Sequence, residues 1–391
     1  MSIYISKNMS EMKPSAIREF FKYAADPAVI SMAAGNPAPD SLPVEAIRRL
    51  TSEIMEKEID GALRYSISEG HPPLRDSLKA YMREQNAFDE NRDELLVLSG
   101  SQQCMDLACR VLCDAGDTII CEDPSFIGSI NSFRSWGVNV VGVPIESDGI
   151  DIEQLERALK TQQRVRFLYL IPNFQNPTGY TMSAKKRAEC YRLAKQYGVL
   201  ILEDDPYGDL RFSGEYVPPI KTLDKDGIVM YARSFSKVLA PGVRVGYLCF
   251  PKELAGPLTV AKQCADVHTG MVSQLICHKF LTEEDMAAHL RNISEIYRRK
   301  CDVMLAELDK LPAEKISFSR PQGGLFVWAT LKDGRDAGEF TLRLVKEKKV
   351  AAVPGSAFLA QPGTSPNFRM TYATPTREQI VKGIAAIGEM L

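Results

Sequence analysis

Four short polar segments of the sequence carry the side chains that are best suited to chemistry. They are SGSQQ (99–103), PNFQNPTG (172–179), EDDPYGDL (203–210) and SFSKVLAPGVRVG (234–246). Each lies where an apolar, strand-like run ends, and open α/β sheets bind ligands beyond the carboxyl ends of their strands. A lysine amine condenses with an aldehyde to a Schiff base, while hydroxyl groups and an arginine hold an anion. Lys237 beside Ser234, Ser236 and Arg244 therefore suits an aldehyde that bears a phosphate.

The elements that must position these segments alternate between strand and helix. Apolar runs predict strands at residues 94–98, 118–121, 138–143, 166–171, 199–203 and 228–232. Helical spacing and helix-start signals predict helices at residues 101–113, 151–160 and 183–197. Such alternation is typical of a parallel sheet that is covered on both faces. The sequence therefore predicts an α/β protein with a mostly parallel central sheet sandwiched by helices.

The end of the chain has a different pattern, which predicts a smaller α+β domain. Its expected elements are a long helix at about 285–311, strands at 316–318, 325–329, 350–353 and 368–372, and helices at 337–348 and from 376. We therefore expect a large domain at 41–285 and a small domain at 286–391. Residues 1–40, with a helix near 15–23, are expected to pack with the small domain.

Composition and charge argue against several classes of protein. The 391 residues include 48 Lys and Arg against 50 Asp and Glu, so the formal net charge of −2 gives no whole-chain field for nucleic acid or an anionic membrane. The apolar runs are too short to span a membrane, and the start of the chain lacks a signal-peptide pattern. Nine cysteines without a Cys-x-x-Cys pair and four histidines without metal-ligand spacing argue against a metal site. We expect a cytoplasmic protein.

Two nucleotide-binding motifs are absent and one hydrolase motif is incomplete. The sequence contains neither G-x-G-x-x-G nor a Walker A motif, so nicotinamide and nucleoside-triphosphate chemistry are not supported. Residues 234–237 satisfy S-x-x-K, the nucleophile motif of penicillin-binding proteins, but the companion motifs SDN and KTG are missing. Lys237 is therefore interpreted as an amine that reacts with an aldehyde.

Seven motifs, taken in their order, resemble one family. GNPAPD, LRYS, NPTG, EDDPY, SFSK, PQGGLFVW and NFRMTY span nearly the whole chain in the order of the fold type I, pyridoxal-phosphate-dependent aminotransferases of class I/II. The chain resembles the subgroup that acts on 2-aminoadipate, kynurenine and aromatic amino acids. The resemblance implies pyridoxal 5′-phosphate, a homodimer with shared active sites, and ping-pong transfer through the pyridoxamine form. The implied donors are 2-aminoadipate, glutamate, and aromatic or branched aliphatic amino acids, with a 2-oxo acid such as 2-oxoglutarate as acceptor.

The resemblance implies the catalytic residues by their place in these motifs. Lys237 matches the Schiff-base lysine, which is also the base that moves the proton of the substrate α-carbon. Asp204 matches the carboxylate at the pyridine nitrogen, because the family's aspartate lies three residues before its tyrosine, here Tyr207; Asp205 is the alternative. Asn176 and Tyr207 match the pair at the 3′ oxygen of the cofactor, and Asn176 also reaches a substrate carboxylate.

The phosphate of the cofactor has its own predicted site. Ser101 and Gln102 begin a helix directly after a strand, where free backbone N–H groups and the helix dipole favour a dianion. The resemblance places Ser234, Ser236 and Arg244 on the remaining sides, and the arginine supplies a charge-assisted contact.

The remaining expected contacts follow from the resemblance as well. Phe126 matches an aromatic residue, commonly Tyr in the family, that stacks on the pyridine ring, and Tyr65 matches a tyrosine that reaches the phosphate in the neighbouring subunit. Arg369 matches the arginine that binds the substrate α-carboxylate, near the backbone of Gly35. Arg18 matches an arginine that meets the distal carboxylate of an acidic substrate; the alternative is a solvated helix residue.

Two other functions stay open at this point. C–S β-lyases and decarboxylases of the same fold share the cofactor contacts, since the reaction depends on which substrate bond stands perpendicular to the ring. Aminotransferase-like domains also act as effector sensors in one family of bacterial transcription regulators, behind an N-terminal winged helix-turn-helix. The motifs of this chain already begin at Gly35, which argues against such a regulator. The sequence is interpreted as a transaminase of class EC 2.6.1, with the lyase or decarboxylase as the alternative.

Overall fold

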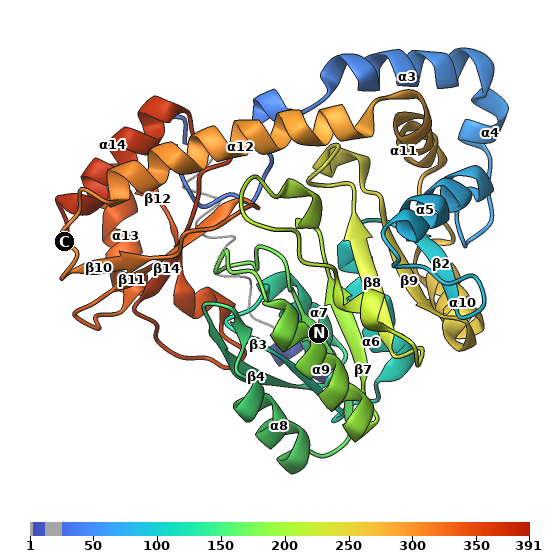
Figure 1. The fold of residues 1–391 in the computed structure, drawn as a ribbon, viewed down its shortest axis with the longest axis horizontal. Helices are drawn as coiled ribbons and strands as arrows, with labels where there is room; N and C mark the ends of the chain where they lie inside the picture. The colour runs from blue at the N-terminus through green and yellow to red at the C-terminus, as the bar shows by residue number, and fades with distance from the viewer. Residues whose placement is uncertain (1–2, 12–25) are drawn as a thin grey trace.

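A mixed eight-stranded sheet forms the centre of the part of the chain that the computed structural model describes, residues 3–11 and 26–391 (Figure 1). Its strands are β2 (Asp93–Leu98), β3 (Thr118–Asp123), β4 (Asn139–Glu146), β5 (Gly149–Ile150), β6 (Val165–Leu170), β7 (Leu200–Asp204), β8 (Val229–Ser234) and β9 (Gly246–Pro251). They follow the order β2-β9-β8-β7-β6-β3-β4-β5. The prediction of a mostly parallel sheet is confirmed, since β4, β3, β6, β7 and β8 pair in parallel.

β9 was not among the predicted strands. It lies antiparallel between β2 and β8, and Gly246 pairs with Leu98 on one side and with Ser234 on the other. A Cβ on Gly246 would lie 2.7 Å from the backbone nitrogen of Ser101, so this close approach requires glycine. The end of β8 therefore lies close to the end of β2 and to the start of α6 (Ser101–Leu112), the helix that follows β2.

Helices cover both faces of the sheet. The covering helices are α6, α7 (Ile127–Ser135) and α10 (Ala255–Asp266) on one face, and α8 (Ile152–Thr161) and α9 (Ala184–Tyr197) on the other. Phe167 and Tyr169 of β6 pack with the first group, whereas Leu168 and Leu170 pack with the second. Because side chains alternate along a strand, a strand that is buried on both faces has the unbroken apolar sequence from which it was predicted.

A further group of helices lies at the β2–β9 end of the sheet and shares a hydrophobic core with these two strands (Figure 1). They are α3 (Val44–Lys57), α4 (Ile59–Leu63), α5 (Pro72–Glu84) and α11 (Met271–Glu283). α11 packs against the other three helices. Leu50, Ile54, Leu74 and Leu78 are buried in the resulting core, which explains the apolar positions at helical spacing in α3 and α5.

The C-terminal part builds a second, antiparallel sheet. Its elements are α12 (Met286–Leu308), β10 (Ile316–Phe318), β11 (Phe326–Leu331), α13 (Ala337–Lys348), β12 (Val350–Ala351), β13 (Val353–Pro354), β14 (Asn367–Thr371) and α14 (Arg377–Gly388). The sheet has the order β10-β11-β14-β13, and α12 runs from beside α14 toward α11 (Figure 1). The strand predicted at 350–353 is wrong as a single element, because β12 and β13 pair with different partners. Arg369 in β14 lies opposite Trp328 and Val353.

The segment before α3 is joined to this C-terminal part. β1 (Ile30–Ser31) pairs in parallel with β12, and the backbone N–H of Ala38 donates to the Tyr297 hydroxyl of α12 at 3.2 Å. Further upstream, Asn8 of α1 (Lys7–Glu11) donates to the Ser135 carbonyl at the end of α7. The helix expected near 15–23 lies outside the described residues, and the domain borders at 40 and 285 stay predictions.

Lys221 forms a fully buried ion pair at the amino ends of β2 and β8. The polar segments lie at the opposite, carboxyl ends of the strands. Its ammonium donates to Asp93 at the start of β2 at 2.8 Å, to Asp224 at 2.9 Å and to the carbonyl of Val229 at 2.9 Å. All three charged side chains have no exposed surface. A buried pair of this kind is destabilising when one partner is removed, because a charge is left without compensation.

Replacing Lys221 with methionine tests this contribution. We expect Lys221→Met to lower the free energy of unfolding by about 3–5 kcal/mol, because two buried carboxylates lose their cation. The measurement is urea unfolding followed by circular dichroism. Lys195→Met is the matched control: its pair with Asp226 is exposed to solvent, so we expect a much smaller loss. Equal losses in the two variants would contradict the argument.

Candidate active site

A cavity of about 340 Å³ opens beyond the carboxyl ends of β6, β7 and β8. The start of α6, the segment around Gly35, and Phe326 and Arg369 of the C-terminal sheet complete its wall. Residues that were predicted from the sequence and line the cavity are Gly35, Ser101, Gln102, Phe126, Asn176, Asp204, Tyr207, Ser234, Ser236, Lys237, Arg244 and Arg369. The fold therefore collects side chains from both sheets into one site.

Lys237 places an amine in this cavity. It follows β8, and its Nζ donates to the carbonyl oxygen of Gly35 at 2.7 Å. Burial, and then the positive charges of Arg369 and Arg244, lower the pKa of Lys237 to about 8. Roughly a tenth of such an amine is uncharged at pH 7, and the uncharged form is the one that attacks an aldehyde.

Asp204 offers a carboxylate oxygen that has no partner. It ends β7, and its Oδ2 accepts a hydrogen bond from the Tyr169 hydroxyl at 2.7 Å, which in turn lies 2.8 Å from Ser129 Oγ. Its Oδ1 is buried and accepts no hydrogen bond. Burial raises the pKa of Asp204 to about 7, against the Tyr169 hydrogen bond, which lowers it. A buried acceptor in a ligand cavity needs a donor, such as the N–H of a protonated ring nitrogen.

Asp205, the alternative candidate, is already engaged elsewhere. Its carboxylate accepts hydrogen bonds from the Tyr231 hydroxyl at 2.7 Å and from the Asn173 amide at 3.1 Å. Successive side chains at the end of a strand point to opposite faces, and Asp205 is not among the cavity-lining residues that the structure describes. The geometry therefore favours Asp204 for any contact with a ligand.

One end of the cavity is built to hold an anion. α6 begins after Gly100, which has no side chain to cap the first N–H groups of the helix. Arg244 takes a left-handed backbone conformation, with a φ of 51°, that non-glycine residues seldom adopt. Its guanidinium donates to the Ser99 carbonyl at 3.3 Å and to Ser236 Oγ at 3.4 Å. Gly100 itself has a φ of 86°, which favours glycine, and a Cβ there would also lie 2.4 Å from that guanidinium and displace it.

The other end carries a buried guanidinium. Arg369 donates to Asn176 Oδ1 at 2.7 Å and to the Ala33 carbonyl at 2.8 Å, and its Nε has no partner. It lies over the ring of Phe326, 4.3 Å from the centroid. Asn176 also donates weakly to the Tyr207 hydroxyl at 3.5 Å. Burial lowers the pKa of Arg369 to about 10, which favours a ligand that brings a negative charge.

The three remaining predicted residues have different outcomes: one lines the cavity, one lies outside it, and one falls outside the described residues. Phe126 lines the cavity next to Gln102, whose amide donates to the Gly128 carbonyl at 2.9 Å. Tyr65 lies outside the cavity: it is 90% exposed, and its ring meets the edge of His268. Arg18 lies outside the described residues.

Some residues at the site were missed by the sequence reasoning. Tyr169 donates a hydrogen bond to Asp204 and is itself hydrogen-bonded to Ser129. The ring of Phe326 packs against the Arg369 guanidinium. Tyr169 belongs to the strand predicted at 166–171, to which no functional role was assigned; the available signal was a polar hydroxyl near the end of a strand that leads into the site. Phe326 lies in PQGGLFVW, a motif that was noted as a whole without roles for its members.

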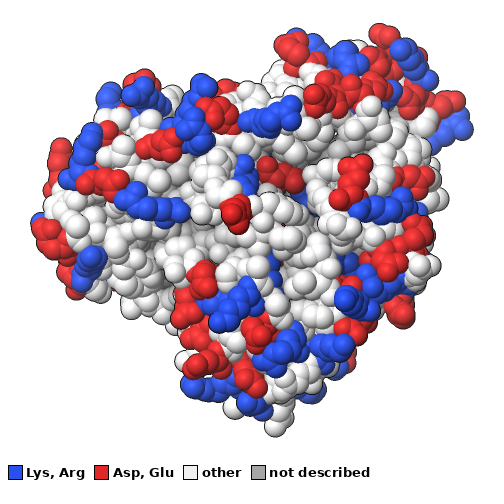
Figure 2. Space-filling model, in the orientation of Figure 1, with Lys and Arg blue, Asp and Glu red and all other residues white. Residues whose placement is uncertain are grey.

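On the face drawn in Figure 2, basic and acidic side chains are interspersed. Across residues 3–11 and 26–391, no helix combines the length and the apolar character needed to cross a membrane. The same residues contain no group of three or more His, Cys, Asp or Glu placed to hold a metal ion.

Taken together, the cavity suits a flat, phosphorylated aldehyde with a basic ring nitrogen. The anion-binding end accepts a phosphate, the free Oδ1 of Asp204 accepts a ring N–H, and Lys237 supplies the amine. Arg369 is left for a second anionic group. Pyridoxal 5′-phosphate has these features, so the residues present fit it.

Comparisons with known proteins agree with this chemistry. Residues 27–387 match the family described as aminotransferase class I and II. The chain is 38% identical to aromatic-amino-acid aminotransferase 1 of Thermococcus litoralis (99% of this chain, 94% of that protein) and 37% identical to 2-aminoadipate transaminase of Thermus thermophilus (98% and 96%). Its fold superposes with a TM-score of 0.95 on Pyrococcus horikoshii kynurenine aminotransferase in complex with PMP (34% identity, 99% and 96% covered). The chain therefore belongs to the class I and II aminotransferases and is a pyridoxal-phosphate-dependent enzyme of that family.

Proposed function

We propose that this aminotransferase moves an amino group from an L-amino acid with an acidic, aromatic or branched aliphatic side chain to a 2-oxo acid such as 2-oxoglutarate. The observation that carries the proposal is that the amine of Lys237 and the guanidinium of Arg369 line one cavity with the unpaired Oδ1 of Asp204. The names of the relatives, which concern aromatic amino acids, 2-aminoadipate and kynurenine, support the choice of donors. 2-Aminoadipate and glutamate are the proposed acidic donors.

Pyridoxal phosphate supplies an aldehyde that reacts with amines and a ring that accepts electrons from the substrate α-carbon. Lys237 is the residue proposed to bind that aldehyde and then, once the substrate amine replaces it, to take and return the α-proton. A pKa near 8 suits both tasks, because the amine is readily uncharged and readily protonated near neutral pH. Asp204 is proposed to keep the ring nitrogen protonated, with Tyr169 holding its other oxygen.

The phosphate is proposed to bind at the start of α6. The N–H groups of Ser101 and Gln102, the hydroxyls of Ser234 and Ser236, and the Arg244 guanidinium surround this end of the cavity. Phe126 is proposed to stack on the ring.

The substrate and the 3′ oxygen of the cofactor are proposed to share the opposite end. Arg369 binds the α-carboxylate through its planar pair of donors, close to the backbone of Gly35. Asn176 orients Arg369 and, with Tyr207, reaches the 3′ oxygen. Removing this arginine would leave the substrate carboxylate buried without a partner.

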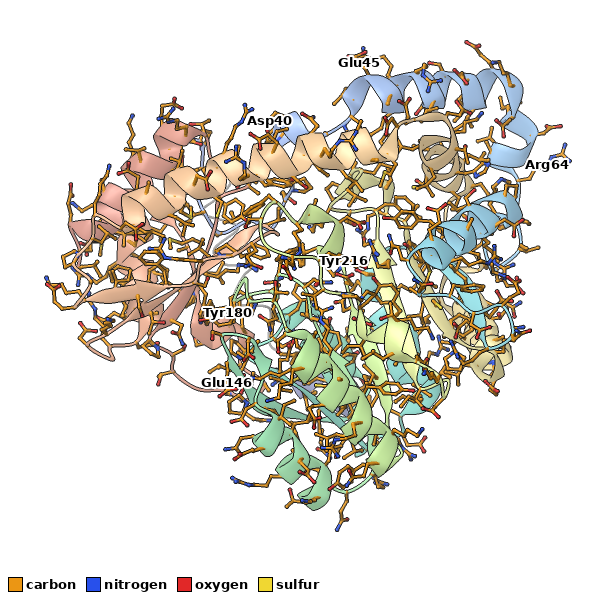
Figure 3. All side chains as sticks on the ribbon, in the orientation of Figure 1. Asp40, Glu45, Arg64, Glu146, Tyr180 and Tyr216 are labelled. Atoms are coloured by element: carbon orange, nitrogen blue, oxygen red, sulfur yellow. The ribbon has the colours of Figure 1, made fainter. Side chains whose placement is uncertain are left out.

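A homodimer with shared sites is the proposed assembly. Tyr65 is 90% exposed and stands between exposed Leu63 and Ile67, and Figure 3 shows the adjacent Arg64 projecting from the edge of the molecule. Exposed apolar side chains in a row are typical of a protein interface. Tyr65 is proposed to reach the phosphate in the partner's cavity.

The cytoplasm is the proposed compartment. All nine cysteines of the chain lie in the described part and are free thiols, and most of them are buried. Reduced cysteines fit a reducing compartment.

The first prediction concerns Lys237. Borohydride reduction should fix the cofactor to the peptide that contains Lys237, and Lys237→Ala should retain the cofactor through its phosphate while losing turnover by at least about 1,000-fold. In cofactor-free protein, the rate of covalent attachment should rise with pH through about 8, because only the uncharged amine attacks. Peptide mass spectrometry and stopped-flow absorbance are the measurements. A label on another lysine would overturn the assignment.

The second prediction concerns the substrate. We expect glutamate, 2-aminoadipate, aromatic and branched aliphatic amino acids to convert the bound cofactor from its aldehyde to its amine form, read by absorbance in single half-reactions. Arg18→Ala should slow the acidic donors by about 10- to 100-fold, the scale of one lost charged hydrogen bond, and leave phenylalanine and leucine nearly unaffected. Equal losses for both kinds of donor would show that Arg18 does not select the side chain.

The third prediction concerns the dimer. A mixture of Tyr65→Phe and Lys237→Ala subunits should recover activity over either variant alone, because one hybrid site contains both native residues. Subunit exchange is verified by mass spectrometry of differently tagged chains, and activity is measured before and after exchange. If exchange occurs without recovery, Tyr65 does not act across the interface.

A further inference from the structure

Lys262 is a buried lysine that has no part in the chemistry described above. It lies in α10, and its side chain has no exposed surface. Its ammonium contacts four side chains: Asp266 at 2.7 Å, Gln103 at 2.7 Å, Thr269 at 3.0 Å and Ser99 at 3.4 Å. Such a cation is costly to bury unless its donors are all satisfied, as they are here.

These contacts converge on one residue, Ser99. The Ser99 hydroxyl donates to Asp266 at 2.6 Å, and its backbone N–H donates to Gln103 Oε1 at 2.9 Å, the same oxygen that accepts from Lys262. Its carbonyl accepts from the Arg244 guanidinium at 3.3 Å. Ser99 is therefore fixed on one side by the Lys262 cluster and bonded on its other side to Arg244.

The position of Ser99 determines the geometry of the anion-binding end. Gly100 follows it with a φ of 86°, and α6 begins with the next residue, Ser101. Since the Gly100 backbone already lies against the Arg244 guanidinium, a shift of Ser99 moves both that guanidinium and the first N–H groups of α6. Lys262 does not line the cavity within the described chain, so it acts through these residues and not by contact with a ligand.

We propose that Lys262 is a positioning residue for the cofactor phosphate: by holding Ser99 through Gln103 and Asp266, it fixes Arg244 and the start of α6 in the arrangement that binds the dianion. This inference rests on the proposed phosphate site. A purely structural lysine would affect stability and all ligands alike, whereas a positioning residue affects ligands that carry the phosphate.

The test compares pyridoxal phosphate with pyridoxal, which has the same ring and aldehyde but no phosphate. Cofactor-free Lys262→Met should bind pyridoxal phosphate about 10- to 100-fold more weakly and pyridoxal less than about 3-fold more weakly, as measured by absorbance titration. Inorganic phosphate, as a competitor of pyridoxal phosphate, should lose affinity in parallel. Lys221→Met is the matched control, because it also removes a buried lysine from an ion pair but at the other end of β2. It should change the affinity of both ligands by the same small factor.

The outcomes separate this inference from the proposed phosphate site. If Arg244→Ala does not weaken pyridoxal phosphate selectively, the phosphate site itself is wrong. If Arg244→Ala does so and Lys262→Met weakens both ligands equally or neither, the role of Lys262 is overturned. Should Lys262→Met fail to fold, Asp266→Asn provides the same comparison, because Asp266 is 32% exposed and the change removes only its charge. We expect a selective loss there too, and its absence would overturn the proposal.

Discussion

The backbone ladder around β9 is the constraint on which the site depends. Gly246 pairs with Leu98 of β2 and with Ser234 of β8, and it also approaches the backbone of Ser101 too closely for any side chain. Residues 98–101 are thereby brought to two segments, at 234 and 246, that lie far from them in the sequence. Only one strand, β9, lies between β2 and β8. The start of α6, which follows β2, is therefore close enough to the serine hydroxyls that follow β8 for both to surround one anion.

The charge balance of the cavity follows from what this ladder brings together. Arg244, Lys237 and Arg369 place three basic groups around one buried space, and Asp204 is the acidic group that lines it within the described residues. The excess of positive charge lowers the pKa of Lys237 and favours a ligand with anionic groups at both ends. The free Oδ1 of Asp204 adds a buried carboxylate acceptor to the same cavity.

The sequence predicted those parts of the fold that depend on local pattern. Strands such as β6, buried on both faces, are visible as apolar runs, and resemblance located the residues that the cavity collects. Properties set by distant pairing were not accessible. β9 is itself a buried apolar run, but its place between β2 and β8 is set by pairing with both of them. Tyr169 looks like core until Asp204 lies beside it. Residues 350–353 divide because β12 and β13 join different sheets. Tyr65 is exposed in the single chain, so its proposed contact with a phosphate requires a second chain.

The edge position of β2 gives a structural role to the two buried lysines that lie at its opposite ends. An edge strand has a neighbour on one side only, so its ends are held less firmly than those of a central strand. Lys221 binds Asp93 at the first residue of β2, and Lys262 holds Ser99 directly after its last residue. Both ends of the strand are thus tied to other elements by ammonium groups without exposed surface. Hydrophobic replacements could supply similar packing, but they would not fix the hydrogen-bonding groups of Ser99, on which the orientation of Arg244 depends.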